Sequence, residues 1–449
     1  MCQFVKHVHS NKGHLRRLAP RCLAVSRCVC KPWRDLVDER RLLRVADLLP
    51  HSLAGFFVNF HNLFDSEFFA RPSITGTAAS GIFSFLPDTE EFSSSLVEDH
   101  CNGLLLFWLS DCVVNPAMGW WARLPPRPPP CKKMDYSHDP YLVFDPAVSP
   151  HYEVFLIQTF HLPCDPRYSK RRDHVPDLAV ETSEWPPTSY ALPVFSSKEG
   201  LWQERSFHRE GEAACTITDM RLGRNRDQKR NAVYWRGALY IHCQTDFLIR
   251  ISLNDDSYQV IKTPEYSGSY YDFYLGRSQN GVYLALYEGG CLQVWILDET
   301  CSKIRWELKH NKDIKHILLG RNNRQGLGPW ILQDIYEDDI MEMLEQNKVK
   351  CDPDKEAALE KFEWISDDEN ALDNDDRVMR GSHGHIDIIG FHPYKEILFL
   401  GESLKTGLAY HLNSSKIEDI GDLYPPYCDL ELINEQFITA SFPYTPCLM

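Results

Sequence analysis

The sequence predicts a mainly β protein, in which a short N-terminal α-helical module precedes a β-propeller-like repeat domain that carries an acidic helical insertion. Three observations predict this organisation. Apolar residues recur at helical spacing near the N-terminus, short strand-like segments fill most of the remaining chain, and acidic residues gather in one stretch. The predicted boundaries are 14–48 for the helical module, 53–449 for the β domain and 334–376 for the insertion.

Two neighbouring rows of apolar residues predict the N-terminal helices. The first row follows steps of three or four and consists of Cys22, Val25, Val29, Trp33 and Leu36. A second row consists of Leu23, Cys30 and Val37. Pro32 removes one helix hydrogen bond, so we expect a kink or a new helix start there. Such a short helical piece cannot form a stable core alone and must pack on the rest of the chain or on a partner.

Short strands separated by Asn, Asp, Gly and Pro turns predict the β domain. The strand candidates are residues 103–109, 141–144, 152–157, 232–243, 247–252, 281–286, 291–297, 396–400 and 407–412. These segments recur in similar units. Gly103, Gly237 and Gly281 mark equivalent positions of three units. The first interval is 134 residues, which we interpret as three repeats of about 44, and the second is 44 residues, which is one repeat. This period is typical of propeller blades and leaves room for six or seven, although a β-sandwich or two stacked barrels remain alternatives.

Composition and charge exclude several classes of protein. The 449 residues are 43% hydrophobic, and no apolar run approaches the roughly 18 residues that a membrane-spanning helix needs. The first 20 residues lack the apolar centre of a signal peptide, and the 15 cysteines follow no disulfide spacing, so we expect reduced thiols and a cytoplasmic or nuclear location. The net charge of −15 argues against nucleic acid or a membrane as a partner.

Most of the excess charge lies in residues 334–376, which hold 17 acidic residues and four lysines, a net charge of −13. We interpret this segment as a solvated, partly helical insertion, with an acidic docking strip for a basic partner as the alternative.

The sequence contains no recognisable catalytic motif, so we predict a protein that is not an enzyme and that needs no cofactor or metal. Two sets of residues suggest metal ligands. Cys22, Cys28 and Cys30 lie on a helical repeat and fit buried thiols better than a zinc site. His383, His385 and Asp387 fit a polar turn better than a metal set.

The N-terminal stretch LRRLAPRCLAVSRCVCKPWRDLVDERRLL resembles the C-terminal part of an F-box. The residues that carry the resemblance, and that it implies as adaptor-binding residues, are Leu18, Leu23, Val29, Cys30, Lys31, Trp33 and Leu36. In the family, this module binds the SKP-type adaptor of a cullin-based SCF ubiquitin ligase. The family's opening leucine–proline motif should precede His14, where the sequence reads MCQFVKHVHSNKG, so we expect a truncated F-box.

The β domain resembles the F-box-associated β domain of plant F-box proteins, particularly those of grasses. The resemblance rests on His100-Cys101-Asn102-Gly103-Leu104-Leu105, on the segments 113–116 and 121–126, and on the segment 142–154. The residues themselves indicate structure: Asn102-Gly103 can open a strand through a positive-φ turn, and Asn115-Pro116 and Asp145-Pro146 can end strands. In the family, this domain captures the protein to be ubiquitinated.

Together these features predict a substrate-recognition adaptor of an SCF ligase, with the SKP-type adaptor, the cullin scaffold and an unknown target protein as partners. Two alternatives stay open. One is a protein-binding propeller that no longer assembles into a ligase because the F-box is incomplete. The other is a propeller enzyme with a metal in its central channel, held by His383 and His385.

Overall fold

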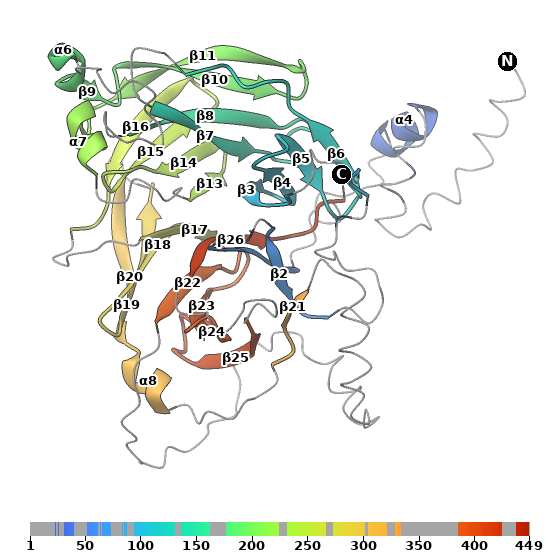
Figure 1. Ribbon diagram of the computed structural model, residues 1–449, viewed down its shortest axis with the longest axis vertical. Coiled ribbons are helices and arrows are strands. Elements are labelled where there is room, and N and C mark those ends of the chain that lie inside the picture. Colours follow the sequence, from blue (N-terminus) through green and yellow to red (C-terminus); the bar gives the residue numbers. More distant parts are fainter. Residues whose placement is uncertain are drawn as a thin grey trace, which may run out of the picture.

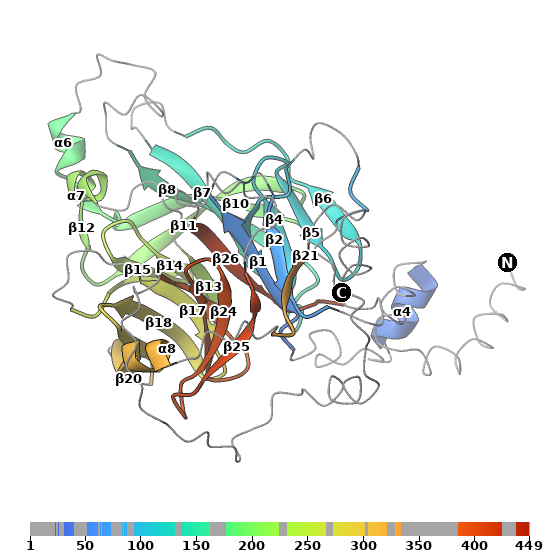
Figure 2. The same ribbon diagram turned by 60° about the horizontal axis from the view of Figure 1, so that its bottom comes forward.

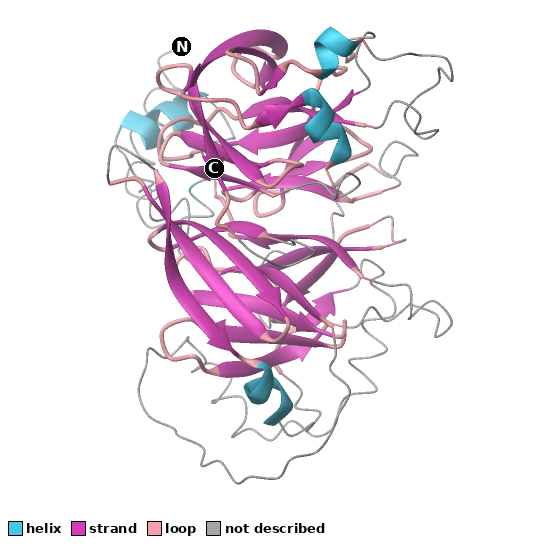
Figure 3. Ribbon diagram, turned by 90° about the vertical axis from the view of Figure 1, so that its left-hand side faces the viewer, coloured by secondary structure: helices cyan, strands magenta, loops and turns pink. Residues whose placement is uncertain are grey.

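The fold is mainly β, as predicted (Figures 1 and 3). The computed structural model describes residues 23, 26, 31–39, 52–61, 63, 65–72, 83, 85–87, 94–130, 136–161, 177–223, 231–265, 273–300, 304–320, 328–333, 385–423 and 437–448. The predicted acidic insertion at 334–376 lies outside these residues. The helices whose bounds lie within the described residues are α4 (Lys31–Glu39), α6 (Leu178–Glu181), α7 (Ile217–Leu222) and α8 (Lys315–Gly320).

The strands form antiparallel units of four, which we number along the chain. Unit 1 consists of β3 (Val97–Cys101), β4 (Leu104–Phe107), β5 (Cys112–Asn115) and β6 (Trp120–Arg123). Unit 2 consists of β7 (Tyr136–Val143), β8 (Glu153–Phe160), β10 (Ser189–Ser196) and β11 (Leu201–Glu210). Unit 3 consists of β13 (Ala232–Trp235), β14 (Ala238–His242), β15 (Phe247–Ser252) and β16 (Ser257–Lys262).

Three further units complete the β domain. Unit 4 consists of β17 (Tyr274–Ser278), β18 (Gly281–Glu288), β19 (Cys291–Asp298) and β20 (Arg305–Asp313). Unit 5 consists of β22 (Ile386–Phe391), β23 (Ile397–Glu402), β24 (Thr406–His411) and β25 (Ile417–Asp422). Unit 6 consists of β26 (Ile438–Tyr444), β1 (Gly55–Phe60), β2 (Glu67–Ala70) and β21 (Ile331–Gln333).

Unit 6 joins the two ends of the β domain. The C-terminal strand β26 pairs with β1 from Gly55 opposite Tyr444 to Phe60 opposite Ile438. On the other side of β1, β2 pairs with β21, which comes from the connection between units 4 and 5. The N-terminal and C-terminal strands are therefore neighbours in one sheet (Figure 2).

Units 2 and 3 share a continuous eight-stranded sheet, because their last strands, β11 and β16, pair in parallel from His208 opposite Ser257 to Glu210 opposite Gln259. A small antiparallel pair, β9 (Glu184–Trp185) and β12 (Cys215–Thr216), lies beside α6 and α7 in the connections of these two units. The connections add residues to unit 2 without adding strands to its main sheet.

Each hydrophobic core of the β domain lies between two consecutive units. The cores join unit 1 to 2, 2 to 3, 3 to 4, 4 to 5 and 5 to 6, and a further core joins unit 6 back to unit 1. Strand β4 shows how the sequence produces this arrangement. Leu104 and Leu106 face unit 2, while Leu105 and Phe107 face unit 6, because successive side chains of a strand point to opposite faces. The uninterrupted apolar run LLLF therefore belongs to a strand that is covered on both faces.

The strand predictions were correct in position but incomplete. The segment predicted at 247–252 is β15. The segment predicted at 232–243 is two strands, because Arg236 and Gly237 adopt positive φ and reverse the chain between them. The interval from Gly103 to Gly237 spans two units instead of three, because the long connections of unit 2 imitate an extra repeat. Each unit has four strands.

Candidate functional site

Four of the seven sequence-predicted adaptor-binding residues are described, and they lie in α4 or beside it. Leu23 and Val37 are buried, and Trp33 and Leu36 are partly buried against them; we call these four residues the helix cluster. Lys31 is exposed at the first position of α4. Leu18, Val29 and Cys30 lie outside the described residues. Three of the seven predicted residues, Leu23, Trp33 and Leu36, are therefore brought together, and Val37 from the second apolar row joins them.

The helix cluster shares no described residue with the cores of the β domain. In both Figure 1 and Figure 2, α4 lies to the side of the sheets. Pro32 occupies the second position of α4, in the first turn, where a missing backbone N–H costs no helix hydrogen bond. The arrangement presents a short amphipathic helix, which is the form that hydrophobic grooves of partner proteins accept.

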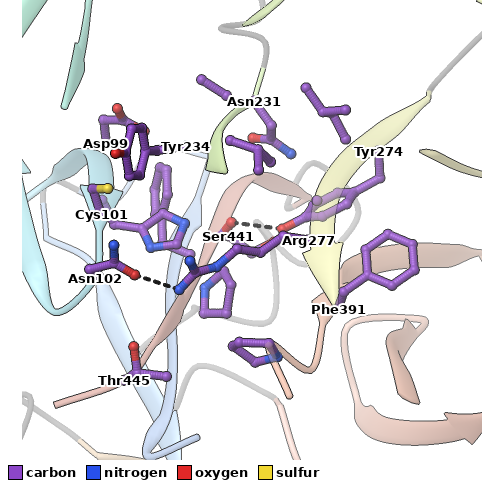
Figure 4. A pocket seen from close by; sticks show the side chains of 18 residues that line it. Asp99, Cys101, Asn102, Asn231, Tyr234, Tyr274, Arg277, Phe391, Ser441 and Thr445 are labelled. Carbon is purple, nitrogen blue, oxygen red and sulfur yellow. Dashed lines mark hydrogen bonds between the residues drawn. The ribbon is translucent and has the colours of Figure 1, made fainter. Parts of the chain in front are cut away.

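A second candidate site is a cavity among the first strands of the units, which we call the central cavity (Figure 4). Its lining comes from units 1, 3, 4, 5 and 6, at or next to the strands β3, β13, β17, β22 and β26. The cavity volume is about 40 Å³. Because one ordered water needs at least about 10–15 Å³ measured in this way, the cavity has room for about three waters or one small polar group. It is far smaller than a cofactor site, which takes roughly 300 Å³ or more.

Arg277 and Asn102 connect opposite parts of this cavity. Arg277 is the fourth residue of β17, and its Nη2 donates a hydrogen bond of 2.6 Å to Oδ1 of Asn102 (Figure 4). Asn102 follows β3, and its Nδ2 donates to the carbonyl oxygen of Phe144 at 2.6 Å. The amide of Asn102 is thus held from two sides. The two residues are 175 positions apart in the sequence, and only the fold brings them together.

Buried polar groups surround this contact. Asp99 accepts a hydrogen bond of 2.6 Å from the backbone N–H of Leu142, which connects units 1 and 2. Burial raises the pKa of the Cys101 thiol to about 12, with Arg277 opposing the shift, so the thiol is protonated at neutral pH. A protonated, buried thiol is a poor nucleophile. The cavity is therefore suited to binding and not to thiol chemistry.

The turn predicted at Asn102-Gly103 is confirmed and has a role that the sequence did not indicate. The two residues have φ angles of 46° and 88°, as a tight turn between β3 and β4 requires. A Cβ atom on Gly103 would lie 2.5 Å from Cβ of Cys447 and 2.6 Å from the carbonyl oxygen of Thr445. The glycine therefore allows the residues after β26 to pack against unit 1. The end of β5 at Asn115, before Pro116, is also as predicted.

The second set of residues considered as metal ligands, which we expected to form a polar turn, is only partly described. His385 is exposed, and its Nε2 lies 3.1 Å from Oδ1 of Asp387, while His383 lies outside the described residues. Within the described ranges, no three His, Cys, Asp or Glu side chains are grouped as metal ligands. Within the same ranges, no helix has the length and apolar character that crossing a membrane requires.

Sequence reasoning missed Arg277, because the surrounding Tyr-Leu-Gly-Arg-Ser matches no motif of binding residues. A comparison with known protein families found no match, and a comparison with curated proteins found none either. Among solved structures, the chain is similar to AztD from Citrobacter koseri, with 11% identity over 73% of this chain and 71% of that one. The TM-score of 0.28 is too low to indicate a shared fold.

Proposed function

We propose that the chain is a non-catalytic substrate-recognition subunit of an SCF ubiquitin ligase, in which the N-terminal helices bind an SKP-type adaptor and the β domain binds a target protein. The adaptor in turn binds a cullin scaffold. The proposal combines the F-box-like residues of the sequence with the position of α4 in the fold.

The observation that carries the proposal is the separation of the helix cluster from the β domain. Trp33 and Leu36 pack with Leu23 and Val37 and with none of the described core residues of the sheets. The four described residues of this cluster are by themselves too few to stabilise a helix of nine residues in water. A groove on a partner protein would cover the rest of its apolar surface.

For the β domain we propose a six-bladed β-propeller, in which each four-stranded unit is one blade. Six cores that follow one another from unit to unit, and that close between units 6 and 1, support this architecture. The pairing of β26 with β1 would close the ring by joining both ends of the domain in one blade. A closed ring leaves no unit without neighbours and gives a rigid platform for a target protein.

The proposed mechanism is proximity. An adaptor that holds the target beside a ubiquitin-charged enzyme makes their encounter intramolecular and raises the effective concentration of the target lysines. The transfer chemistry then belongs to other subunits. The alternative is a protein-binding platform that does not join a ligase.

Co-purification of the full chain with an SKP-type adaptor tests the proposal. We expect recovery of the adaptor with the unchanged chain, and loss of about 2 kcal/mol of binding free energy, roughly thirtyfold in affinity, with Trp33→Ala. Arg34→Gln is the matched control, because Arg34 is exposed on the same helix. Equal recovery with Trp33→Ala and the unchanged chain would contradict the assignment of α4.

If the unchanged chain recovers no adaptor, a chimera that carries a complete F-box first helix separates the two functions. Binding by the chimera alone favours the platform alternative, with the β domain still available to a target. Failure of both chains removes the ligase proposal.

A further inference from the structure

Arg277 differs from the other partly or fully buried arginines of the β domain in its partners. Five of those arginines form ion pairs with a carboxylate: Arg127 with Glu98, Arg205 with Asp256, Arg209 with Glu184, Arg221 with Glu181 and Arg250 with Glu299. Arg277 donates to the neutral amide of Asn102, and within the described part of the chain no carboxylate forms an ion pair with it. A guanidinium has five N–H donors, and within the described residues Arg277 uses one of them, in its bond to Asn102.

The surroundings hold this cation in place. Asn102 is 7% exposed and is fixed by its bond to the carbonyl oxygen of Phe144, so its Oδ1 offers a rigid anchor to Arg277. At the thiol of Cys101, the effect of the Arg277 guanidinium on the pKa is larger than that of the Asp99 carboxylate. A positioned cation costs little reorganisation when an anion binds.

Four residues of the cavity lie toward one end of the units. Asn102, Phe391 and Thr445 are at or just beyond the C-terminal ends of β3, β22 and β26, and Arg277 is one residue from the end of β17. The turns at this end are short, with two residues at Asn102-Gly103 and two at Arg236-Gly237, whereas the connection that supplies β21 begins at the other end of unit 4.

We propose that the central cavity binds the carboxylate of an acidic side chain from the target protein, through Arg277 held by Asn102. The volume of about 40 Å³ suits a single carboxylate group, and a guanidinium binds a carboxylate through two parallel hydrogen bonds. The inference rests on the proposed role of the β domain in target binding and names the chemistry of that contact.

Thermal unfolding of the full chain with small carboxylates tests the inference. The probes are glutarate, which mimics an acidic side chain, its neutral counterpart glutaramide, and inorganic phosphate, all at the same ionic strength. We expect glutarate to raise the Tm more than glutaramide or phosphate, because a ligand that binds only the folded state stabilises it. Arg277→Gln should abolish this difference, and the matched control Arg236→Gln, at an exposed arginine of a short turn, should leave it unchanged.

A second measurement does not depend on how well a variant folds. In the unchanged chain, glutarate should slow the modification of Arg277 by 2,3-butanedione several-fold, followed by mass spectrometry, and should leave the modification of Arg236 unchanged. Equal protection of both arginines, or equal protection by glutaramide, would overturn the inference. Stronger protection of Arg277 by phosphate than by glutarate would replace the carboxylate with a phosphate ligand and would also overturn it.

The outcome is separable from that of the proposed ligase role. Arg277→Gln should leave co-purification with the SKP-type adaptor unchanged, because Arg277 belongs to the β domain. Specific protection of Arg277 in a chain that binds no adaptor would retain the carboxylate site and remove the ligase role. Binding of the adaptor by a chain in which glutarate does not specifically protect Arg277 would retain the ligase role and remove the carboxylate site.

Discussion

The helix cluster and the β domain bury apolar side chains in different ways. Around α4, the described cluster consists of four residues on one helical stripe. In the β domain, six cores follow one another, and strands such as β4 contribute to two of them at once. A strand inside a closed series of sheets is covered on both faces by its own chain, while the helix has one apolar face and few residues to cover it. Among the described residues, the β domain therefore buries apolar side chains in a continuous series of cores, and the helix cluster forms a separate small core.

The largest expected effect comes from removing one end of the chain at a time, which tests whether the β domain is stable without the helix. A chain that ends at residue 437 lacks β26, so β1 loses one of its two pairing partners and the core between units 6 and 1 loses Phe442 and Tyr444. We expect it to lose the cooperative thermal unfolding transition. A chain that lacks residues 1–48 should keep the transition and its Tm. Circular dichroism checks both, and a cooperative transition without β26 would show that the ring closure is dispensable.

The second way compares single apolar side chains. Phe56 is fully buried, and its ring lies 4.8 Å from that of Phe399. Phe56→Ala should lower the free energy of unfolding by about 3–5 kcal/mol, the usual range for a buried aromatic residue. Val37→Ala, in the helix cluster, should leave the unfolding of the β domain unchanged. Urea denaturation measures both, and similar losses in the two variants would mean that the helix and the sheets unfold together.

The third way uses pH, because the β domain buries titratable groups whereas the helix cluster is apolar. Burial, aided by the charge of Lys395, lowers the pKa of His392 from 6.5 to about 4. Above pH 6.5 the imidazole is neutral in both the folded and the unfolded chain, so it does not lower the free energy of unfolding. Between pH 6.5 and about 4, His392 is protonated in the unfolded chain but remains neutral in the folded chain. The free energy of unfolding therefore decreases by about 3 kcal/mol as the pH falls through this interval.

Urea denaturation at pH 7 and pH 5 measures this effect. His392→Phe should lose less stability over that interval than the unchanged chain, whatever its stability at pH 7. The same pH dependence in both chains would assign the loss to other groups, such as His310, whose pKa burial also lowers.

The smallest expected effect concerns the contact between the C-terminal residues and unit 1. Gly103→Ala should destabilise the β domain by about 2–3 kcal/mol, because the new Cβ meets Cys447 and the backbone of Thr445. Gly211→Ala is the matched control, since Gly211 has nearly the same φ, 90° against 88°, and no atom within 4 Å of the new Cβ. It should cost only about 1 kcal/mol. Equal decreases in the free energy of unfolding of the two variants would show that the close contact at Gly103 does not contribute to stability.

Several elements could be predicted because their signal is local. The helical spacing of Trp33 and Leu36 located α4, and the turn chemistry of Asn102-Gly103 located the start of β4. The same local signals failed at unit 2, where long connections imitated an additional repeat. The candidate site was predictable only in part: Asn102 lay in a segment that was singled out, whereas Arg277 had no motif around it.

The sequence by itself determined which residues form strands, where the chain turns and which helix carries an apolar stripe, because periods of two and 3.6 and positive-φ turns depend on neighbouring residues. Only the tertiary structure decided that β26 pairs with β1, that β21 completes the same sheet, and that Arg277 reaches Asn102. These contacts join residues far apart in the chain. They depend on which faces and edges remain uncovered once all the sheets have packed, which no local pattern encodes.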